Sequence, residues 1–364
     1  MKILAIDTSC DDTSIAISND KKIIANVSWS KAKLHNEMGG VVPSEAKRQH
    51  KEFLDPAIEK ALHEANLKIE NIDTIAVTYG PGLAIALETG ILKAKELSIE
   101  YNKPLIAVNH MIGHIYSNLA ENENGKSYSG INNFEFPLLA LTISGGHTDL
   151  YLMKSHLEFE HIGRTLDDAI GEAFDKVGRM LGMGFPAGAK VEDAATVGNP
   201  NAFEFPRPMS NSGDLNWSFS GLKTAVLYQI KKIQNEYEIK PNKKEHKMID
   251  ESNSLSKKLI NDVAASFQEA ATESLLIKLK KALQQYNPKM LIVGGGVVAN
   301  SALRAKLNSL SSQSNIPLYY PKPMWLCTDN ASMIAVAGYY YAKAGFFVQN
   351  ISALDRVPSL EINP

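Results

Sequence analysis

The fold is decided by the stretch Lys2-Ile3-Leu4-Ala5-Ile6-Asp7-Thr8-Ser9-Cys10-Asp11-Asp12-Thr13-Ser14-Ile15-Ala16-Ile17. Its apolar runs at residues 2–6 and 14–17 predict two buried strands that are joined by a polar turn. The same order recurs at residues 137–141, 143–148 and 149–152, which again form an apolar run, a polar turn and a second run. Two such units at the head of two halves predict a duplicated α/β fold with a cleft between two lobes, although two unrelated hairpins explain the same residues equally well.

The composition indicates a folded protein from a reducing compartment. A length of 364 residues suggests about two domains, and 38 basic against 40 acidic residues give a net charge of −2. Any contact with nucleic acid must therefore come from a local basic patch. Two cysteines exclude a secreted disulfide framework. Asp7 interrupts the N-terminal apolar run before a signal peptide can form, and no apolar run approaches the roughly 18 residues of a membrane span. We expect a cytoplasmic protein without a membrane partner.

Alternating strands and helices follow the first unit and favour α/β lobes. We expect a helix over residues 44–66 that is kinked or broken at Pro56, a strand at 72–77, a helix over 83–100, a strand at 105–108, a long amphipathic helix through 263–283 and a strand at 290–293. The Lys-rich segment 231–258 is weakly apolar and is expected to be a mobile surface excursion.

His110 and His114 are spaced to share a metal ion. Residues four apart on a helix project from one face, and the preceding strand places this pair at a strand-to-helix edge. Most histidine pairs at this spacing are exposed or satisfied in a core, so a third ligand is needed. Asp329 opens a small-residue helix and is a candidate, although a carboxylate there is also a common helix cap. Met111 stands where a metallopeptidase of the His-Glu-x-x-His type has its glutamate, which argues against a peptidase.

Three small-residue turns, each after a buried strand, are candidates for phosphate contact. They span residues 7–13, 144–148 and 294–300, and their exposed backbone N–H groups can approach an anion closely. None matches a phosphate-loop or dinucleotide consensus, and each alone is more often a plain tight turn. Asp175 can accept hydrogen bonds from ribose hydroxyls, or it can form an ion pair with Arg179 one helical turn away.

Eight motifs occur together in the order of one family. They are Asp7-Thr8-Ser9-Cys10-Asp11-Asp12-Thr13-Ser14, Gly39-Gly40-Val41-Val42-Pro43, Gly80-Pro81-Gly82-Leu83, Asn109-His110-Met111-Ile112-Gly113-His114, Ser144-Gly145-Gly146-His147-Thr148, Gly171-Glu172-Ala173-Phe174-Asp175-Lys176, Gly294-Gly295-Gly296-Val297 and Cys327-Thr328-Asp329-Asn330. From Met1 to about Gly345 the chain resembles the bacterial type of the TsaD family, the tRNA threonylcarbamoyltransferase subunit once described as a sialoglycoprotein endopeptidase.

The resemblance implies a two-lobed actin/sugar-kinase/Hsp70-like (ASKHA) fold of duplicated RNase H-like domains with a central cleft. It also implies transfer of the threonylcarbamoyl group from threonylcarbamoyl-AMP to the N6 amine of the adenosine 3′ of a tRNA anticodon. The implied partners are tRNA and TsaB-like and TsaE-like proteins. The implied cofactor is one divalent metal ion, Fe(II) ahead of Zn(II), on His110, His114 and Asp329. The substrate contacts carried over from the family are Thr142, Ile143, Ser144, Gly145, Gly146, Asp175, Gly188, Glu192 and Asn300.

Asp11 and Asp12 lie on the first turn, and we expect them to be candidates for receiving the amine proton. Basic clusters at residues 47–51 and 243–247 are candidates for tRNA contact, although solvated charged faces explain either cluster alone. We expect lobe I to comprise residues 1–108 completed by 325–364, and lobe II residues 109–324. Two alternatives share the fold: an ATP-dependent small-molecule kinase and a nucleotide-switched scaffold.

Overall fold

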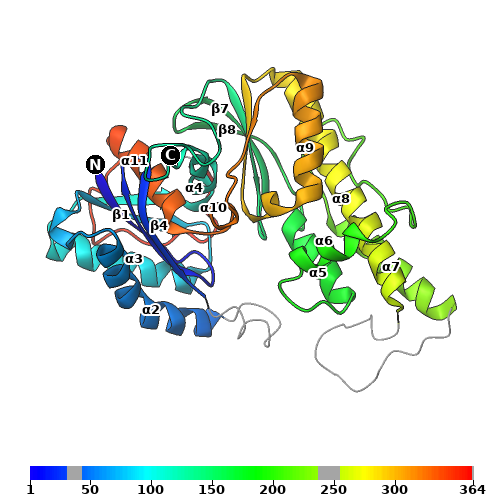
Figure 1. Ribbon diagram of the computed structural model, residues 1–364, viewed down its shortest axis with the longest axis horizontal. Coiled ribbons are helices and arrows are strands. Elements are labelled where there is room, and N and C mark those ends of the chain that lie inside the picture. Colours follow the sequence, from blue (N-terminus) through cyan, green and yellow to red (C-terminus); the bar gives the residue numbers. More distant parts are fainter. Residues whose placement is uncertain (31–42, 237–254, 363–364) are drawn as a thin grey trace.

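The chain folds into two five-stranded sheets, each at the centre of one half of the molecule (Figure 1). The computed structural model describes residues 1–30, 43–236 and 255–362. The motif at residues 39–42 and the basic cluster at 243–247 lie outside this range. Within it, no helix combines the length and the apolar character that are needed to cross a bilayer.

The elements of the first half precede those of the second half along the chain, except for α11 (Ala331–Lys343), which comes last in the chain but packs on the first sheet. The first set is β1 (Lys2–Asp7), β2 (Thr13–Asn19), β3 (Lys22–Trp29), α2 (Pro43–Glu64), β4 (Thr74–Gly80), α3 (Ala84–Glu100), β5 (Leu105–Asn109) and α4 (His110–Tyr116), with short 3-10 helices at Ile69–Asn71 and Ser117–Leu119. The second set is β6 (Leu138–Ile143), β7 (Thr148–Ser155), β8 (Glu158–Arg164), α5 (Ile170–Met180), α6 (Gly188–Thr196), α7 (Ser220–Glu236), α8 (Lys257–Tyr286), β9 (Met290–Gly294), a 3-10 helix at Gly296–Ala299, α9 (Ser301–Ser314) and β10 (Leu318–Tyr319). The chain then forms α10 (Met324–Cys327) and α11 (Ala331–Lys343).

The two sheets have the same topology. The first has the strand order β3-β2-β1-β4-β5, and the second has β8-β7-β6-β9-β10 when it is followed in the same direction. In the first sheet, β1 pairs antiparallel with β2 and parallel with β4. In the second sheet, β6 likewise pairs antiparallel with β7 and parallel with β9. The predicted duplication is therefore confirmed, and the alternative of two unrelated hairpins is wrong.

Side-chain alternation along the central strands separates three hydrophobic cores. In β1, Leu4 and Ile6 face an outer core with α2 and α3, while Ile3 and Ala5 face a middle core. The middle core also contains side chains of α4, α11 and the inner face of β6. The outer face of β6 packs against α5, α7, α8 and α9, which cover the far side of the second sheet (Figure 1). The result is five layers that alternate between helices and sheets.

Helix α4 lies in the middle layer and is locked to both halves. All seven of its residues are buried. On one side, a Cβ at Gly113 would come within 2.9 Å of the Ile334 side chain on α11. On the other side, a Cβ at Gly294 of β9 would collide with the backbone oxygen of His114. Asn118, just beyond α4, donates to the backbone oxygen of Val293 at 3.2 Å. The position of α4 is therefore fixed by both sheets.

Two local expectations are wrong in part. Pro56 does not break the first long helix, because α2 continues through it and its buried side chains Leu54, Ala57 and Ile58 pack in the outer core. The alternative of a kink at Pro56 stays a prediction. Residues 231–236 are not a surface excursion but the last turns of α7, since Ile233 is buried in the core of the second half. Residues 237–254 of the expected excursion lie outside the described range, and 257–258 begin α8.

The lobe boundaries remain our proposal. The packing of α11 on β1 and β2 supports the assignment of residues 325–364 to lobe I together with residues 1–108. The second sheet begins at Leu138 and ends at Tyr319, inside the proposed lobe II of residues 109–324.

Gly294→Ala should destabilise the protein by about 1–3 kcal/mol, because the added methyl group has to push apart β9 and the backbone of α4. The measurement is the free energy of unfolding from urea denaturation. Gly213→Ala is the matched control, since a Cβ at that position has no atom within 4 Å. Equal stabilities of the two variants would contradict the close packing of α4 on β9.

Candidate active site

Two imidazole rings lie one turn apart on α4. The helix starts at His110 because the Asn109 side-chain oxygen accepts hydrogen bonds from the backbone N–H groups of Met111 (2.8 Å) and Ile112 (3.3 Å). His110 and His114 consequently project from the same face, with ring centroids 4.8 Å apart. Both residues are buried, His114 completely.

Asp329 approaches both rings from the loop before α11. Its Oδ1 atom lies 3.4 Å from His110 Nε2 and 3.2 Å from His114 Nε2. The possible ligand atoms of the three residues all lie within 4.8 Å of one another. Asn330, not Asp329, caps α11, because its side-chain oxygen accepts from the backbone N–H of Met333 at 3.1 Å. The capping explanation for Asp329 is therefore wrong, and its carboxylate is left to face the histidines.

The electrostatics of this group fit a bound cation. Burial alone would lower the pKa of His110, but the carboxylates of Asp329 and Asp7 outweigh it and raise that pKa to about 10. Burial lowers the pKa of His114. Both nitrogens of His114 are buried without an aligned hydrogen-bond partner. Two acidic groups thus favour positive charge here, and the fully buried imidazole of His114 has ring nitrogens that no aligned hydrogen bond uses, as expected for a metal ligand.

A cavity of about 680 Å³ opens over these residues between the two halves of the chain. From the first half it is lined by Ser9, Cys10, Asp12, Pro81, Gly82, Leu83, His110, Thr328 and Asp329. From the second half it is lined by Ser144, Gly145, Gly146, His147, Glu172, Asp175, Lys176, Arg179, Phe185 and Gly296. The cavity is large enough for a nucleotide-sized ligand.

Glycines keep the floor of the cavity open. A Cβ at Gly145, Gly146 or Gly296 would have no atom within 4 Å, so a side chain there would occupy the cavity itself. The turn that carries Gly145 and Gly146 is closed by a hydrogen bond from the Ser144 N–H to the His147 oxygen at 2.9 Å. Gly295 has a different role: its φ of +98° and its contact with the backbone oxygen of Ile143 are constraints that only glycine meets easily.

Several expected contact residues do not line the cavity. The side chain of Ile143 packs in the core of the second half, and Thr142 lies buried beneath the turn. Gly188 donates its N–H to Asp175 Oδ1 at 3.1 Å.

Asn300 and Glu192 have structural partners. Asn300 caps α9 by accepting from the Leu303 N–H at 2.8 Å, and its amide donates to Gln268 at 2.8 Å. The Glu192 carboxylate accepts from the backbone N–H of Ser301 at 2.7 Å. These bonds fix the start of α9 beside the third glycine turn. A direct contact of either side chain with substrate stays a prediction.

The turn between β1 and β2 is held by Gln49 and His50, two members of the predicted basic cluster at residues 47–51. Asp12 lines the cavity, whereas Asp11 is not among its lining residues. Gln49 donates to the backbone oxygen of Asp11 at 2.7 Å, and His50 lies 2.8 Å from Thr13 Oγ1. The buried members of the cluster at 47–51 therefore support this turn instead of facing solvent.

Three residues to which the sequence patterns assigned no individual role in the site belong to it. Asp7 is buried, with its Oδ1 atom 3.7 Å from His110 Nδ1. His147 ends the glycine turn. Arg179 forms no ion pair with Asp175 but has its guanidinium carbon 5.5 Å from the Phe185 ring centroid. A carboxylate that ends a central strand, as Asp7 does, was a usable signal, whereas the pairing of Arg179 with Phe185 depends on the fold of the intervening loop.

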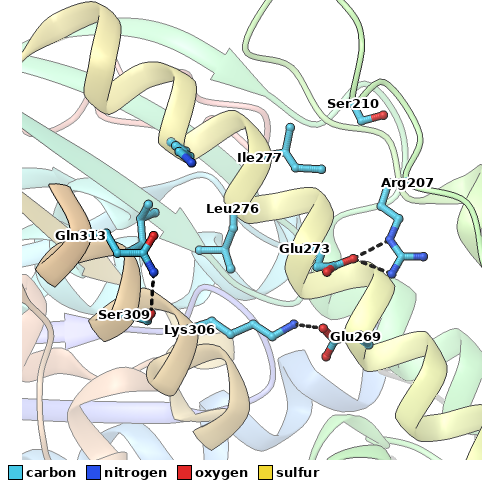
Figure 2. A pocket seen from close by; sticks show the side chains of 11 residues that line it. Arg207, Ser210, Glu269, Glu273, Leu276, Ile277, Lys306, Ser309 and Gln313 are labelled. Atoms are coloured by element: carbon cyan, nitrogen blue, oxygen red, sulfur yellow. Dashed lines mark hydrogen bonds and ion pairs between the residues drawn. The ribbon is translucent and has the colours of Figure 1, made fainter. Parts of the chain in front are cut away.

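A second hollow, of about 580 Å³, lies between α8 and α9 and shares no residue with the first (Figure 2). Figure 2 shows that four of its charged side chains are directed at one another in two pairs. Arg207 pairs with Glu273 and Lys306 with Glu269. These four charges are satisfied by each other, and we assign no ligand to this hollow.

Comparison with known proteins identifies the family. The sequence model of the TsaD family, described as tRNA N6-adenosine threonylcarbamoyltransferase, matches residues 22–336. The chain belongs to the TsaD family. A protein of that same name from Thermosipho africanus (strain TCF52B) is 44% identical over 362 residues, which cover 100% of both chains. Another, from Staphylococcus saprophyticus, is 44% identical over 344 residues, 94% of this chain and 92% of the relative. The expectation of a TsaD family member, and so of an enzyme of the transferase class, is confirmed.

Solved structures confirm the two-lobed ASKHA fold. HypF from T. kodakarensis superposes with a TM-score of 0.56 at 13% identity and covers 94% of this chain and 48% of HypF. The activator of the 2-hydroxyisocaproyl-CoA dehydratase from Clostridium difficile, with bound ADPNP, superposes with a TM-score of 0.50 at 13% identity and covers 97% of this chain and 100% of the activator. At these identities the likeness concerns the fold alone.

Asp12→Asn should change how stability depends on pH. Burial raises the pKa of Asp12 to about 6, and the carboxylates of Asp11 and Asp329 add to this against a hydrogen bond with Ser30. Because the folded state binds this proton more tightly, the stabilising contribution is full at low pH and is lost as the pH rises through about 6. Urea denaturation of metal-free protein should show the wild type losing about 1 kcal/mol relative to Asp12→Asn between about pH 5 and pH 8. Parallel pH profiles would contradict the buried position of this carboxyl.

Gly146→Val should block the cavity without unfolding the TsaD protein, since open space surrounds the position. We expect AMP affinity, measured by calorimetry, to fall about tenfold or more, which corresponds to about 1.4 kcal/mol. The melting temperature should stay close to that of the wild type. Gly213→Val, also at an open position but outside the lining of the cavity, is the control and should bind AMP normally.

Proposed function

We propose that this TsaD protein transfers the threonylcarbamoyl group from threonylcarbamoyl-AMP to the N6 amine of the adenosine 3′ of a tRNA anticodon. The observation that supports the proposal is the meeting of His110, His114 and Asp329 with the Ser144–Gly146 turn in one cavity. A kinase or a nucleotide-switched scaffold needs the glycine turn but has no use for the histidine pair.

His110, His114 and Asp329 would hold one divalent metal ion, and we propose Fe(II) ahead of Zn(II). Two imidazoles and one carboxylate with open positions are typical of non-haem Fe(II) sites, although Zn(II) accepts the same donors. When bound, such an ion acts as a Lewis acid toward an oxygen of the donor. Asp7, 3.7 Å from His110 Nδ1, is placed to orient that ring from behind.

The donor is a mixed carbamoyl–phosphate anhydride with a good leaving group, so the reaction needs orientation and charge stabilisation but no enzyme nucleophile. Backbone N–H groups of residues 144–146 would bind its oxygens. Arg179 lines the same cavity and has a buried Nε atom without a partner, which supports a role in binding the phosphate. Asp175 would contact the adenosine, because only its Oδ1 atom is used by the backbone of Ala187 and Gly188.

In the transfer step the N6 lone pair attacks the carbamoyl carbon. A C–N bond forms, the C–O bond to the phosphate breaks, and AMP leaves with its electron pair. The displaced amine proton would pass to a carboxylate, and Asp12 is the better placed of the two candidates because it lines the cavity. Asp11, on the same turn, stays a candidate. Full single-turnover rates in Asp11→Ala and Asp12→Ala would exclude both.

The partners are proposed from the family. We propose TsaB-like and TsaE-like proteins in addition to tRNA, and a cytoplasmic location, where tRNA is modified. Leu92 and Ile99 on α3 are 57% and 65% exposed, which supports a partner surface on that helix.

His114→Ala should remove the metal and the activity together. We expect metal content, measured by mass spectrometry of purified protein, to fall to background. Formation of threonylcarbamoyladenosine from threonylcarbamoyl-AMP and a tRNA transcript should fall about 100-fold or more, since even substitutions behind the ligands lower metal affinity or activity 10–100-fold.

His63→Ala on the exposed end of α2 is the control and should behave as the wild type. Retention of metal and product by His114→Ala would contradict the proposed site. An unchanged profile of modified tRNA nucleosides after depletion of this protein from cells would contradict the function itself.

A further inference from the structure

A third cavity, smaller than the two described above, adjoins the large cavity that contains the candidate active site. It measures about 260 Å³ and shares two lining residues with the large cavity, Pro81 and His147. Its other lining residues are Met111, Asp149, Tyr151, His161, Arg164, Pro358, Ser359, Leu360, Glu361 and Ile362. They come from the start of α4, from two strands of the second sheet and from the C-terminal segment. None of them has a role in the function proposed above.

The C-terminal segment forms one wall of this small cavity and is held in place by the cleft itself. The Val357 N–H donates to the Tyr79 oxygen at 2.8 Å, and the Gly82 N–H donates to the Pro358 oxygen at 3.1 Å. Asn109, which caps the helix of the histidine pair, donates its side-chain amide to the Glu361 oxygen at 3.1 Å. A Cβ at Gly80 would collide with the backbone oxygen of Val357. This wall lies beyond residue 336, where the match to the family model ends.

The lining of the small cavity combines ring surfaces with hydrogen-bonding groups. His161 stacks on Tyr151 with ring centroids 4.6 Å apart, and its Nε2 atom lies 3.0 Å from Asp149 Oδ1. At the edge, Arg164 and Glu361 are 3.5 Å apart, and both side chains are more than half exposed. Aromatic rings with hydrogen-bond donors and acceptors beside them can stack on and hydrogen-bond a heterocyclic base. An exposed arginine at the edge can pair with a phosphate next to that base. The volume is below the roughly 300 Å³ of drug-sized pockets, which suits a single base.

His147 connects the two cavities through the glycine turn. Its N–H donates to Ser144 Oγ at 3.2 Å and its oxygen accepts from the Ser144 N–H, so its backbone is fixed by the turn that forms the floor of the large cavity. A transferase must bring two substrates into contact at the reacting atoms. Two cavities that meet at one residue provide that arrangement: the large cavity for the donor, and the small one for the group that attacks it.

We propose that the small cavity binds the purine base of the acceptor adenosine, with the N6 amine directed past His147 toward the donor. The inference rests on the proposed function and adds to it the place of the acceptor. The phosphate beside that base would replace Glu361 as the partner of Arg164. A single-stranded loop nucleotide, splayed out of its stack, can enter such a cavity, whereas a paired base cannot.

The test fills the cavity from an exposed position. Ser359→Trp places a large ring in the cavity. Ser352→Trp, the same substitution at an exposed serine of the C-terminal segment that lines neither cavity, is the matched control. Initial rates are measured at several concentrations of an anticodon stem-loop RNA, and AMP affinity is measured by calorimetry. We expect Ser359→Trp to lower kcat/KM for the RNA at least tenfold while AMP affinity and melting temperature stay within error, and Ser352→Trp to match the wild type.

A second measurement locates the base directly. A stem-loop RNA with a photoreactive azidoadenosine at the acceptor position should crosslink to Tyr151 or to the peptide of residues 357–362, as mapped by mass spectrometry. Crosslinks confined to other peptides, or an active wild type with an equally active Ser359→Trp variant, would overturn this inference alone. A wild-type protein that binds RNA and AMP but forms no threonylcarbamoyladenosine would instead overturn the proposed function.

Discussion

A buried pair of imidazoles facing a carboxylate is the constraint on which the rest of the structure depends. Polar groups without partners are expensive to bury, and His114 is fully buried with unused nitrogens. The surroundings allow this only because they hold α4 rigidly. Asn109 fixes the first turn, Gly113 lets α11 approach, and Gly294 lets β9 approach. Removal of any one of these contacts would let the ring positions drift relative to Asp329.

The duplicated fold explains why the site forms between the halves. Each sheet carries a hairpin between its first two strands, and the turns of both hairpins contribute residues to the cavity: Ser9, Cys10 and Asp12 from one, and Ser144 to His147 from the other. The start of α11 is joined to the first hairpin, since the Ala331 N–H donates to Ser14 Oγ at 2.8 Å. Asp329, two residues earlier, is thereby held against α4. One lobe alone would present only part of the constellation.

Local patterns in the sequence favoured a duplicated fold and predicted the shared helix face of His110 and His114, whereas the full fold and the addition of Asp329 were implied by the resemblance to the family. Strand–turn–strand order marks the duplication, and a spacing of four marks a shared helix face. The failures concern contacts that no local pattern records. Glu192 fixes Ser301, and His50 holds the first-lobe turn, because the tertiary fold brings distant segments together. The Lys-rich composition of residues 231–236 predicted a surface excursion, but these residues form the end of α7. Their apolar side chain Ile233 is buried because it packs on a distant part of the chain. The wall made by residues 357–362 has no apolar periodicity, and its position follows from the close approach allowed by Gly80.

The late position of α11 in the chain has a consequence for biosynthesis. The inner face of β1 is covered by α11, a helix that leaves the ribosome only after both sheets have been synthesised. Until then Ile3 and Ala5 lack their final neighbours, and the nascent first half exposes apolar surface that invites aggregation or chaperone binding. A product of premature termination would contain the histidine pair without Asp329 and without this cover. Synthesis through α11 is therefore required before the apolar inner face of β1 is covered and before His110, His114 and Asp329 can meet.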